Sequence, residues 1–503
     1  MLAAVTVLAV TLRVMGIAEN PPGFWFDESA VAVNAALIAE AGVDQYGEPW
    51  PLFFRALDDY KEPLFVYSVA LAVKLLGRTV ESARVPAALW GAFGVLVAYA
   101  LGREILGSID GGVWTALFVA VTPWHIHFSR WSEQAIVLTV VYSAAVLFMI
   151  RLARRGRVRD GASAGLLLAS CFYAYSPAKL LVAVSLATFL AYAGYCRRPH
   201  GRALVAFLAA FAVTALPFVA FYVTTNELMN LRFQHVRAPW RDMPAAYLSH
   251  LDPRFLFGRG DADLRLATRA AMLPWYLGPL ALGGAAVVLA RRSWAGAALV
   301  GVVVFTPVLG SLTRHYPHAT RTITALPFVQ VLAAAGCLYL LDRTPPRFRR
   351  IAGIGLLLTV AVSLGLFWRH YWNTYRYRSR VEWNYGLIPA LEFAARQARH
   401  GADVYAPPAH YSDWMFATRV HAEAIIAQRE KLRAGRDHYD PRDLAGKYAF
   451  VEPRARLGRR AREAWDASRP PRGLWIVPAD DLPAGFDAPC ELRSGLYCVA
   501  RFR

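Results

Sequence analysis

The sequence predicts a polytopic α-helical membrane protein of about eleven transmembrane helices, followed by a small extracytoplasmic α/β domain. Three observations predict this fold class. The chain is 56% hydrophobic and 18% charged, whereas soluble domains carry about 25% charged residues. Apolar runs that can cross a hydrocarbon core of about 30 Å recur down to Trp368. After Trp368 the composition becomes polar and basic.

The apolar runs set the expected positions of the spans. The first run has no basic start and no small-residue cleavage site, so we expect a retained span rather than a signal peptide. The spans are expected near residues 1–17, 82–103, 112–129, 133–151, 161–176, 178–196, 203–223, 272–290, 294–312, 322–341 and 351–368.

The arginines between the spans give the orientation. Loops rich in Arg stay in the cytoplasm, and here they alternate with loops of mixed charge. The Arg-rich loops lie at residues 151–159, 197–202, 291–292 and 342–350. The N-terminus is then inside and the acidic first loop outside. We expect helices at 29–41 and 63–76 to lie along the outer surface, because a crossing at 63–76 would reverse the side of every later Arg-rich loop.

The chain divides into two expected domains. Residues 1–369 form a transmembrane catalytic domain with long outer loops at 18–81 and 224–271. Residues 370–503 alternate strand-like and helical patterns and form the extracytoplasmic α/β domain. Near its end, Cys490 and Cys498 are spaced for a disulfide across a hairpin, as an extracytoplasmic location allows.

The net charge of +19 first suggests nucleic-acid binding. The arginines, however, fall largely in short loops between spans and in the last quarter of the chain. That distribution is the positive-inside pattern with a basic soluble tail. We therefore expect no nucleic-acid partner. The five cysteines show no metal-ligand spacing.

Ionisable residues crowd the outer ends of the spans and leave the middles nearly free of charge. A transporter or pump would place charges near mid-span, so this distribution disfavours one. The first outer loop is especially acidic. The outer-end residues are Asp27, Glu28, Arg84, His125, His127, Arg130, Glu133, Lys179, Arg314, His315, His318 and Arg321.

Carboxylates, imidazoles and cations gathered at one membrane face suit one class of reaction. Cations stabilise a departing phosphate, and a carboxylate takes the proton from an attacking hydroxyl. A site at bilayer depth indicates a lipid donor. Transfer of a sugar from a polyprenyl-phosphate carrier meets these conditions.

Several segments resemble bacterial members of glycosyltransferase family 39. These segments read RVMGIAENPPGFWFDESA, YKEPLFVYSVALAVKLLG, ESARVPAALWGAFGVLVAYALGREILG, TPWHIHFSRWSEQAIVL, FYAYSPAKLL and PHATRTITALPF. The family consists of GT-C enzymes related to protein O-mannosyltransferases and to the lipid A aminoarabinose transferase. The resemblance covers residues 10–200 well, PHATRTITALPF moderately, and residues 224–270 and the C-terminal domain loosely.

The resemblance implies catalytic roles for acidic residues. The family's essential acid just after the first span acts as base or positions the acceptor, and it corresponds to Asp27, with Glu28 beside it. A second acid at the outer start of the fourth span corresponds to Glu133. A divalent cation at Asp27 and Glu133 is left open, because hard cations prefer oxygen ligands, but no cofactor is required.

The resemblance also implies a contact with the donor phosphate. Relatives of the aminoarabinose type read Glu-Lys-Pro at the end of the first loop, with Lys on the lipid phosphate. Here the order is Lys61-Glu62-Pro63. Because of this inversion, Arg314 or Arg321 is an alternative phosphate ligand. The other residues expected to bind substrate are Glu62, Arg84, His127, Arg130, Lys179 and His318.

Each candidate also has a purely structural interpretation. Asp27 and Glu28 could cap the helix that follows them. Glu133 could pair with Arg130 one turn away. The imidazoles and the other cations could anchor the chain at the membrane interface.

We therefore expect a membrane glycosyltransferase in a bacterial cytoplasmic membrane, with its site and C-terminal domain outside. The family resemblance implies that the transfer inverts the anomeric carbon. Its expected partners are the bilayer, a polyprenyl-phosphate sugar and a protein, lipid or envelope-glycan acceptor. The alternatives are a transporter or flippase for lipid-linked sugars and a non-catalytic envelope scaffold.

Overall fold

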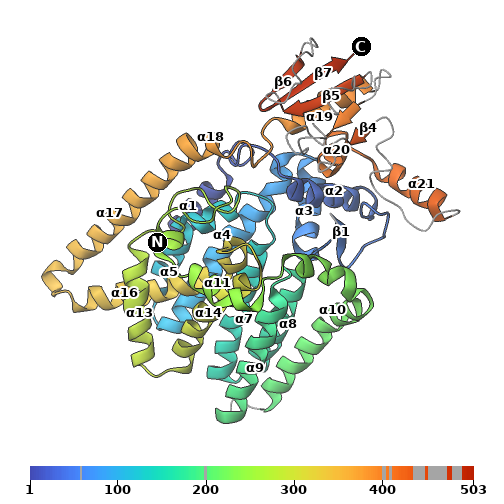
Figure 1. The fold of residues 1–503 in the computed structure, drawn as a ribbon. Helices are drawn as coiled ribbons and strands as arrows, with labels where there is room; N and C mark the ends of the chain where they lie inside the picture. The colour runs from blue at the N-terminus through green and yellow to red at the C-terminus, as the bar shows by residue number, and fades with distance from the viewer. Residues whose placement is uncertain are drawn as a thin grey trace. The chain divides into compact units, whose positions relative to one another are not determined.

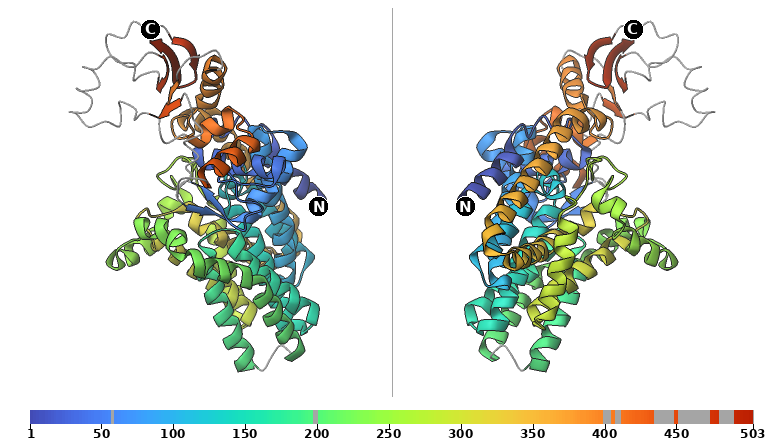
Figure 2. Two further views of the ribbon diagram at one scale, coloured as in Figure 1. Left: turned by 90° about the vertical axis from the view of Figure 1, so that its right-hand side faces the viewer. Right: turned by 90° about the vertical axis from the view of Figure 1, so that its left-hand side faces the viewer.

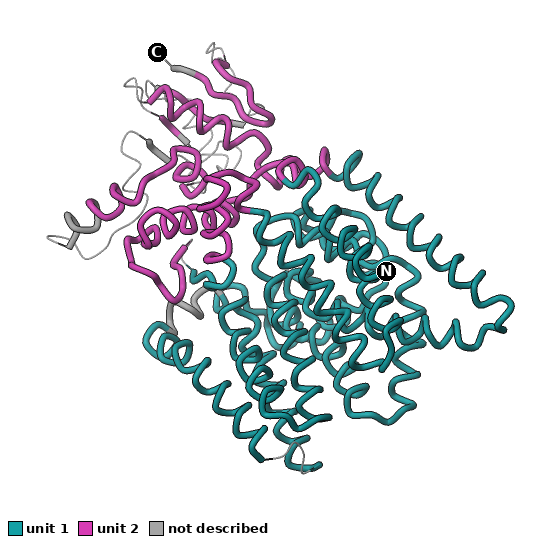
Figure 3. The backbone as a smooth tube through the Cα atoms, turned by 180° about the vertical axis from the view of Figure 1, so that it is seen from behind, with its two compact units in different colours: residues 1–17, 58–65, 84–375 teal, residues 18–57, 66–83, 376–503 magenta. Residues whose placement is uncertain are grey.

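The computed structural model describes residues 1–56, 59–196, 201–398, 404–406, 411–433, 448–450, 473–478 and 490–502. The chain forms two compact units, coloured in Figure 3. Unit 1 comprises residues 1–17, 58–65 and 84–375. Unit 2 comprises residues 18–57, 66–83 and 376–503.

Unit 1 is helical, and each of the eleven expected spans falls on one of its helices. These are α1 (Leu2–Val14), α4 (Val80–Leu106), α5 (Ile109–Val121), α7 (Ala135–Arg155), α8 (Val158–Ser170), α9 (Ala178–Cys196), α10 (Gly201–Val236), α13 (Leu277–Ala290), α14 (Trp294–Ser311), α16 (Leu326–Arg343) and α17 (Pro346–His370). Within the described residues, seven helices are long and apolar enough to cross a membrane. Four shorter helices, α1, α3 (Pro63–Leu76), α5 and α13, are also apolar. The expected fold class, a polytopic helical membrane protein, is confirmed.

Close helix pairs organise unit 1. The pair α8 and α10 and the pair α13 and α16 lie side by side (Figures 1 and 2). At Gly165 an added Cβ would lie 2.1 Å from the carbonyl oxygen of Phe207, and at Gly284 one would lie 1.8 Å from that of Leu332. Glycine is therefore required for these backbones to meet, as is common between membrane helices.

Burial separates the centre of unit 1 from its edge. The apolar window of α7 is 83% buried, whereas that of the helix that includes α17 is 11% buried. In Figure 1, α17 stands apart from the other long helices. An apolar helix with so little protein around it is suited to contact lipid tails over most of its surface.

The expected span at 112–129 is divided in the structure. Helix α5 ends at Val121, and a separate short helix, α6 (Pro123–Phe128), follows. Pro123 favours the first position of a helix, and it keeps the preceding Thr122 extended (φ −70°, ψ 121°). His125 and His127 are therefore on a short connecting helix rather than at the end of a continuous span.

The second outer segment begins where expected, because non-helical dihedral angles at Thr225 separate the apolar span, which ends at that residue, from the rest of α10, which ends at Val236. Short elements follow: η2 (Trp240–Asp242), α11 (Met243–Ser249) and α12 (Pro253–Phe257). Further along unit 1 are α15 (Ala319–Thr322), η3 (Ile323–Ala325) and the π-helical turn η4 (Tyr371–Tyr375).

Unit 2 joins the first outer segment to the C-terminal residues. Its described elements include α2 (Phe26–Ala41), β1 (Phe54–Ala56), α3, α18 (Arg376–Arg378), α19 (Leu387–Ala398), α20 (Tyr411–Ala417) and α21 (Ala422–Arg433). The expected helices at 29–41 and 63–76 correspond to α2 and α3. Every residue of α2 from Glu28 to Ile38 is buried, so α2 is a core helix rather than one lying on a membrane surface.

The C-terminal sheet has the order β4-β3-β5-β7-β6. Its strands are β3 (Val404–Ala406), β4 (Tyr448–Phe450), β5 (Gly473–Pro478), β6 (Cys490–Ser494) and β7 (Tyr497–Phe502). Strand β3 runs parallel to β4 and β5, and β7 runs antiparallel to β5 and β6. A disulfide joins Cys490 to Cys498, with Cα atoms 5.6 Å apart, which confirms the expected hairpin disulfide.

Candidate functional site

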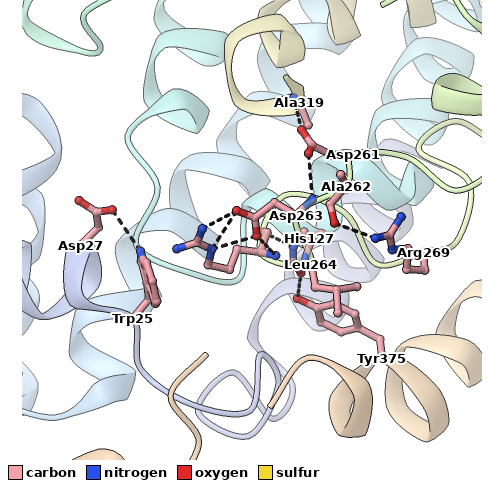
Figure 4. A network of polar contacts seen from close by, with 11 residues as sticks. Trp25, Asp27, His127, Asp261, Ala262, Asp263, Leu264, Arg269, Ala319 and Tyr375 are labelled. Atoms are coloured by element: carbon pink, nitrogen blue, oxygen red, sulfur yellow. Dashed lines mark hydrogen bonds and ion pairs between the residues drawn. The ribbon is translucent and has the colours of Figure 1, made fainter. Parts of the chain in front are cut away.

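Asp27 lies in the first turn of α2, in unit 2. Trp25 is the N-cap residue of this helix, and its indole Nε1 donates a hydrogen bond of 3.1 Å to Oδ2 of Asp27 (Figure 4). The Asp27 side chain is half-buried. A carboxylate at a helix N-terminus, oriented by an indole, can hold a defined position while it remains accessible.

Glu28 is fully buried, and its Oε2 accepts a hydrogen bond of 3.2 Å from the backbone N–H of Trp25. This contact belongs to a capping box at the start of α2. The geometry supports the helix-capping interpretation of Glu28 that the sequence left open.

Lys61, Glu62 and Lys179 come together in unit 1. Burial, and to a smaller extent the Asp59 carboxylate, raise the pKa of Glu62 to about 8, although the two lysines act in the opposite direction. Lys61 ends β2 (Asp59–Lys61), and Lys179 lies in the first turn of α9. Because Glu62 is mostly protonated near pH 7, it does not neutralise the two ammonium groups. This cluster can attract an anion.

The Lys179 ammonium also has an aromatic neighbour. Its Nζ lies 5.0 Å from the centroid of the Tyr222 ring on α10, a distance at which the ring face attracts a cation. Next to it, the rings of Tyr60 and Phe221 meet edge to face, with centroids 5.3 Å apart. These contacts pack β2 against α10 and keep the lysine cluster in place.

Arg130 is buried, and its guanidinium binds the backbone at the end of α1. It donates hydrogen bonds of 2.9 to 3.1 Å to the carbonyls of Leu12, Arg13, Met15 and Gly16. Carbonyls at the end of a helix have no partner within the helix. Arg130 satisfies them, so it has a structural task independent of any substrate.

Arg84 also binds the backbone after α1, one residue further along the chain than the last carbonyl bound by Arg130. It is fully buried, and its Nη1 donates a hydrogen bond of 3.0 Å to the carbonyl of Ile17. Arg84 and Arg130 thus fix the chain where it leaves α1.

His127 and Glu133 lie on either side of Arg130 in sequence. Burial lowers the pKa of His127 to about 4, so its imidazole is neutral near pH 7. Its Nε2 donates a hydrogen bond of 2.8 Å to the carbonyl of Arg265. Glu133 is half-buried and its Oε1 accepts a hydrogen bond of 3.0 Å from the backbone N–H of Ala135, at the start of α7.

Arg314, His318 and Arg321 lie around α15. Arg314 is exposed, and its Nε donates to the carbonyl of Arg237 at 3.1 Å. The backbone N–H of His318 donates to Nε2 of His250 at 3.0 Å. Arg321 donates to the hydroxyl of Thr313. These residues form a second basic group in unit 1, on elements other than those that carry the lysine cluster.

The segment from Asp261 to Arg269 contains polar residues that the sequence analysis did not single out. Asp261 is buried, which raises its pKa, and its Oδ2 accepts a hydrogen bond of 2.9 Å from the backbone N–H of Ala319 (Figure 4). Burial also acts to raise the pKa of Asp263, but the Arg265 guanidinium beside it outweighs this and lowers that pKa. The signal was present as the charged run GRGDADLR in a long outer loop.

Other contacts tie the same segment to the rest of unit 1. The hydroxyl of Tyr375 donates to the carbonyl of Leu264 at 2.7 Å, and Nε2 of His370 donates to the carbonyl of Thr268 at 2.7 Å. Figure 4 shows Tyr375 directed toward the Leu264 carbonyl and Arg269 directed toward the Ala262 carbonyl. The segment is therefore held by α6, α15 and the end of α17.

No group of three or more His, Cys, Asp or Glu side chains that could hold a metal ion occurs among the described residues. Asp27 and Glu133, the pair that the sequence left open for a cation, belong to different units.

Comparison with known proteins supports the resemblance seen in the sequence. Residues 60–223, about a third of the chain, match the family model described as dolichyl-phosphate-mannose-protein mannosyltransferase. The matched range contains the lysine cluster, Arg84, His127, Arg130 and Glu133. No curated protein matches the chain in sequence.

Solved structures share the fold over nearly the whole chain. ArnT from Cupriavidus metallidurans bound to undecaprenyl phosphate is 15% identical, with a TM-score of 0.55 over 99% of this chain and 97% of that one. The apo state of ArnT is 14% identical, with a TM-score of 0.60 over 99% and 96%. The archaeal oligosaccharyltransferase AglB from Archaeoglobus fulgidus, in complex with an inhibitory peptide and a dolichol-phosphate, is 13% identical. Its TM-score is 0.51 over 83% of this chain and 63% of that chain. The chain therefore shares the fold of ArnT and AglB, with a largely helical part and a C-terminal sheet domain.

Proposed function

We propose that this protein transfers a sugar from a polyprenyl-phosphate donor to an extracytoplasmic acceptor, with inversion at the anomeric carbon. The proposal rests mainly on two findings that cover the same residues. The family match over residues 60–223 contains the cluster of Lys61, Glu62 and Lys179, and the GT-C fold extends over 99% of the chain.

The donor phosphate is assigned to the lysine cluster. Glu62 is protonated near pH 7, so Lys61 and Lys179 outweigh the Asp59 carboxylate, and the net positive charge attracts the diester and the phosphate that forms when the sugar leaves. The second basic group, with Arg314, His318 and Arg321, is the alternative position for the phosphate. ArnT has been solved with undecaprenyl phosphate, which supports a lipid phosphate as the ligand.

Asp27 is assigned the role of general base. The acceptor hydroxyl attacks the anomeric carbon, the bond from that carbon to the phosphate oxygen breaks, and polyprenyl phosphate leaves with the bonding electrons. The hydroxyl proton passes to the Asp27 carboxylate. The half-exposed position of Asp27 and the indole hydrogen bond from Trp25 support this role. We propose that Glu133 orients the acceptor, and that Glu28, Arg84, His127 and Arg130 support the site through the backbone contacts described above.

The protein spans the membrane several times. We propose that it lies in the cytoplasmic membrane of a bacterium with the site and unit 2 on the outer side, as the alternation of Arg-rich loops favours. The acceptor is a protein, a lipid or an envelope glycan. A divalent cation at Asp27 and Glu133 is the alternative source of positive charge, and the two lysines supply that charge without one.

The test uses purified protein in detergent with undecaprenyl-phosphate derivatives of mannose, glucose, galactose and aminoarabinose. We expect one of these donors to release undecaprenyl phosphate. This release should increase when an acceptor with a hydroxyl group is added. After reconstitution of the same protein into vesicles, a flippase would move the donor across the membrane without releasing the lipid phosphate. A scaffold would do neither. Either outcome would contradict the proposal.

A further inference from the structure

The C-terminal residues contact the turn that carries Asp27, although almost four hundred positions separate them in the sequence. Ser412 is the second residue of α20 and is fully buried. Its hydroxyl donates to the carbonyl of Phe26 at 3.2 Å and lies 2.8 Å from the hydroxyl of Ser29. Phe26 and Ser29 are on either side of Asp27, so one hydroxyl contacts both sides of the first turn of α2.

A second contact lies just before this turn. The rings of Phe24 and Phe416 pack with centroids 4.8 Å apart, and both side chains are buried. The far end of α20 is held in turn by Arg78, which donates to the carbonyls of Met415 at 2.9 Å and Val420 at 3.1 Å. Helix α20 is therefore fixed at both ends within unit 2.

The chain that leads into α2 is also fixed by the C-terminal residues. A Cβ added at Gly23 would lie 1.9 Å from the carbonyl oxygen of Trp383, a side chain that is fully buried. Further back, Nη2 of Arg376 lies 3.0 Å from Oε2 of Glu19. Contacts to residues 376–417 thus occur at Glu19, Gly23, Phe24, Phe26 and Ser29.

We infer that Ser412 is a positioning residue: through the first turn of α2 it sets the place of the Asp27 carboxylate. The inference rests on the proposed role of Asp27 as general base. A base must be held within a fraction of an ångström of its working position, and small displacements are costly to the rate. The part of the chain expected to be a separate soluble domain would then contribute directly to the reaction.

The kinetic test compares three single variants in the full chain, with the undecaprenyl-phosphate sugar that the wild-type protein consumes fastest. Ser412→Ala removes both hydrogen bonds and should lower kcat about five- to tenfold, with KM for the donor unchanged. Ser412→Thr keeps the hydroxyl and should recover most of the rate. Thr418→Ala is the matched control, because the Thr418 hydroxyl donates to the Trp414 carbonyl of α20, and this variant should leave kcat unchanged.

A double variant tests whether Ser412 acts through Asp27. In an Asp27→Asn background, Ser412→Ala should lower the remaining rate by less than twofold, because the group that it positions is already impaired. An equal loss in both backgrounds, or a rise in KM with kcat unchanged, would overturn the inference and leave the proposed function intact.

A measurement that does not depend on turnover separates the two proposals. Amide hydrogen exchange of the peptide that covers residues 24–36 should become at least several-fold faster in Ser412→Ala and should not change in Thr418→Ala. If the wild-type protein consumes no donor, the proposed function fails, and the catalytic part of the inference fails with it. If exchange in Ser412→Ala equals that of the wild-type protein, the inference fails even where turnover is observed.

Discussion

The guanidinium of Arg130 donates a hydrogen bond of 2.9 Å to the carbonyl of Leu12, 118 positions earlier in the chain. It is one of four such bonds to the end of α1. The same guanidinium lies over the rings of Trp368, Tyr371 and Trp372, at 5.5 to 5.7 Å from their centroids. One side chain therefore joins the end of α1 to the end of α17 within unit 1.

Replacing Arg130 should destabilise the protein. In Arg130→Ala the buried carbonyls lose their donor, and we expect a loss of about 3 kcal/mol or more in the free energy of unfolding. Thermal unfolding in detergent measures the effect. Arg350→Ala, at an exposed position, is the control and should change the midpoint little. Equal midpoints for the two variants would contradict the structural role of Arg130.

The lysine cluster predicts a defect in donor binding. Lys61→Ala and Lys179→Ala should each raise KM for the undecaprenyl-phosphate sugar about tenfold, because each removes a charge that pairs with phosphate. Binding of undecaprenyl phosphate alone should weaken in parallel. Lys74→Ala removes an exposed lysine from α3 and should leave KM unchanged. If all three variants bind the lipid phosphate as the wild-type protein does, the phosphate site lies elsewhere, and Arg314 and Arg321 are the residues to replace next.

Glu62 predicts a dependence of stability on pH. Its pKa is raised from 4.5 to about 8, with burial as the main cause. Between these values the folded protein retains a proton that the unfolded chain has lost, so the contribution of Glu62 to stability falls as pH rises from about 5 to 8. Glu62→Gln removes this titration. Relative to the wild-type protein, its unfolding midpoint should be higher at pH 8 than at pH 5. The same offset at both pH values would show that Glu62 does not titrate in this range.

Asp261 predicts a structural effect in the outer segment. Its two carboxylate oxygens accept hydrogen bonds from the backbone N–H groups of Asp263 and Ala319. Asp261→Asn retains one acceptor and places an N–H₂ group against an N–H donor. We expect a loss of about 1–3 kcal/mol in stability and faster proteolysis between residues 258 and 270. Asp342→Asn, at an exposed position, should show neither effect.

The sequence predicted the membrane helices well, because crossing a bilayer demands long apolar runs and leaves few alternatives. The expected span at 112–129 is divided at Pro123. This division was not predicted, because the apolar sequence continues on both sides of the proline. The sequence predicted that residues 29–41 are helical, but it did not predict that this helix is buried. The surface that covers α2 comes in part from α20, which is far away in the sequence. Contacts such as Ser29 to Ser412 have no local signal.

The residues of the candidate site were predicted unevenly, for a physical reason. Asp27 and Lys61 stand out by residue type, because each is a charged residue within a segment that resembles the glycosyltransferase family. Arg84 and Arg130 stand out in the same way, but their partners are backbone carbonyls, which any sequence contains. A predicted phosphate ligand and a structural arginine therefore look alike until the fold is known. Asp261 lies in the charged run GRGDADLR of a long outer segment, but residue type alone does not distinguish its buried carboxylate from one in a solvated turn.

The central claim is that Asp27 takes the proton from the acceptor. It is tested most directly by the single-turnover rate of sugar transfer from an undecaprenyl-phosphate donor in the Asp27→Asn variant. Asp110→Asn, which changes an exposed aspartate in the first turn of α5, is the control. We predict that Asp27→Asn lowers the rate by about a hundredfold or more, with binding of undecaprenyl phosphate retained and Asp110→Asn unaffected. A single-turnover rate in Asp27→Asn within a factor of two of the wild-type rate would contradict this account.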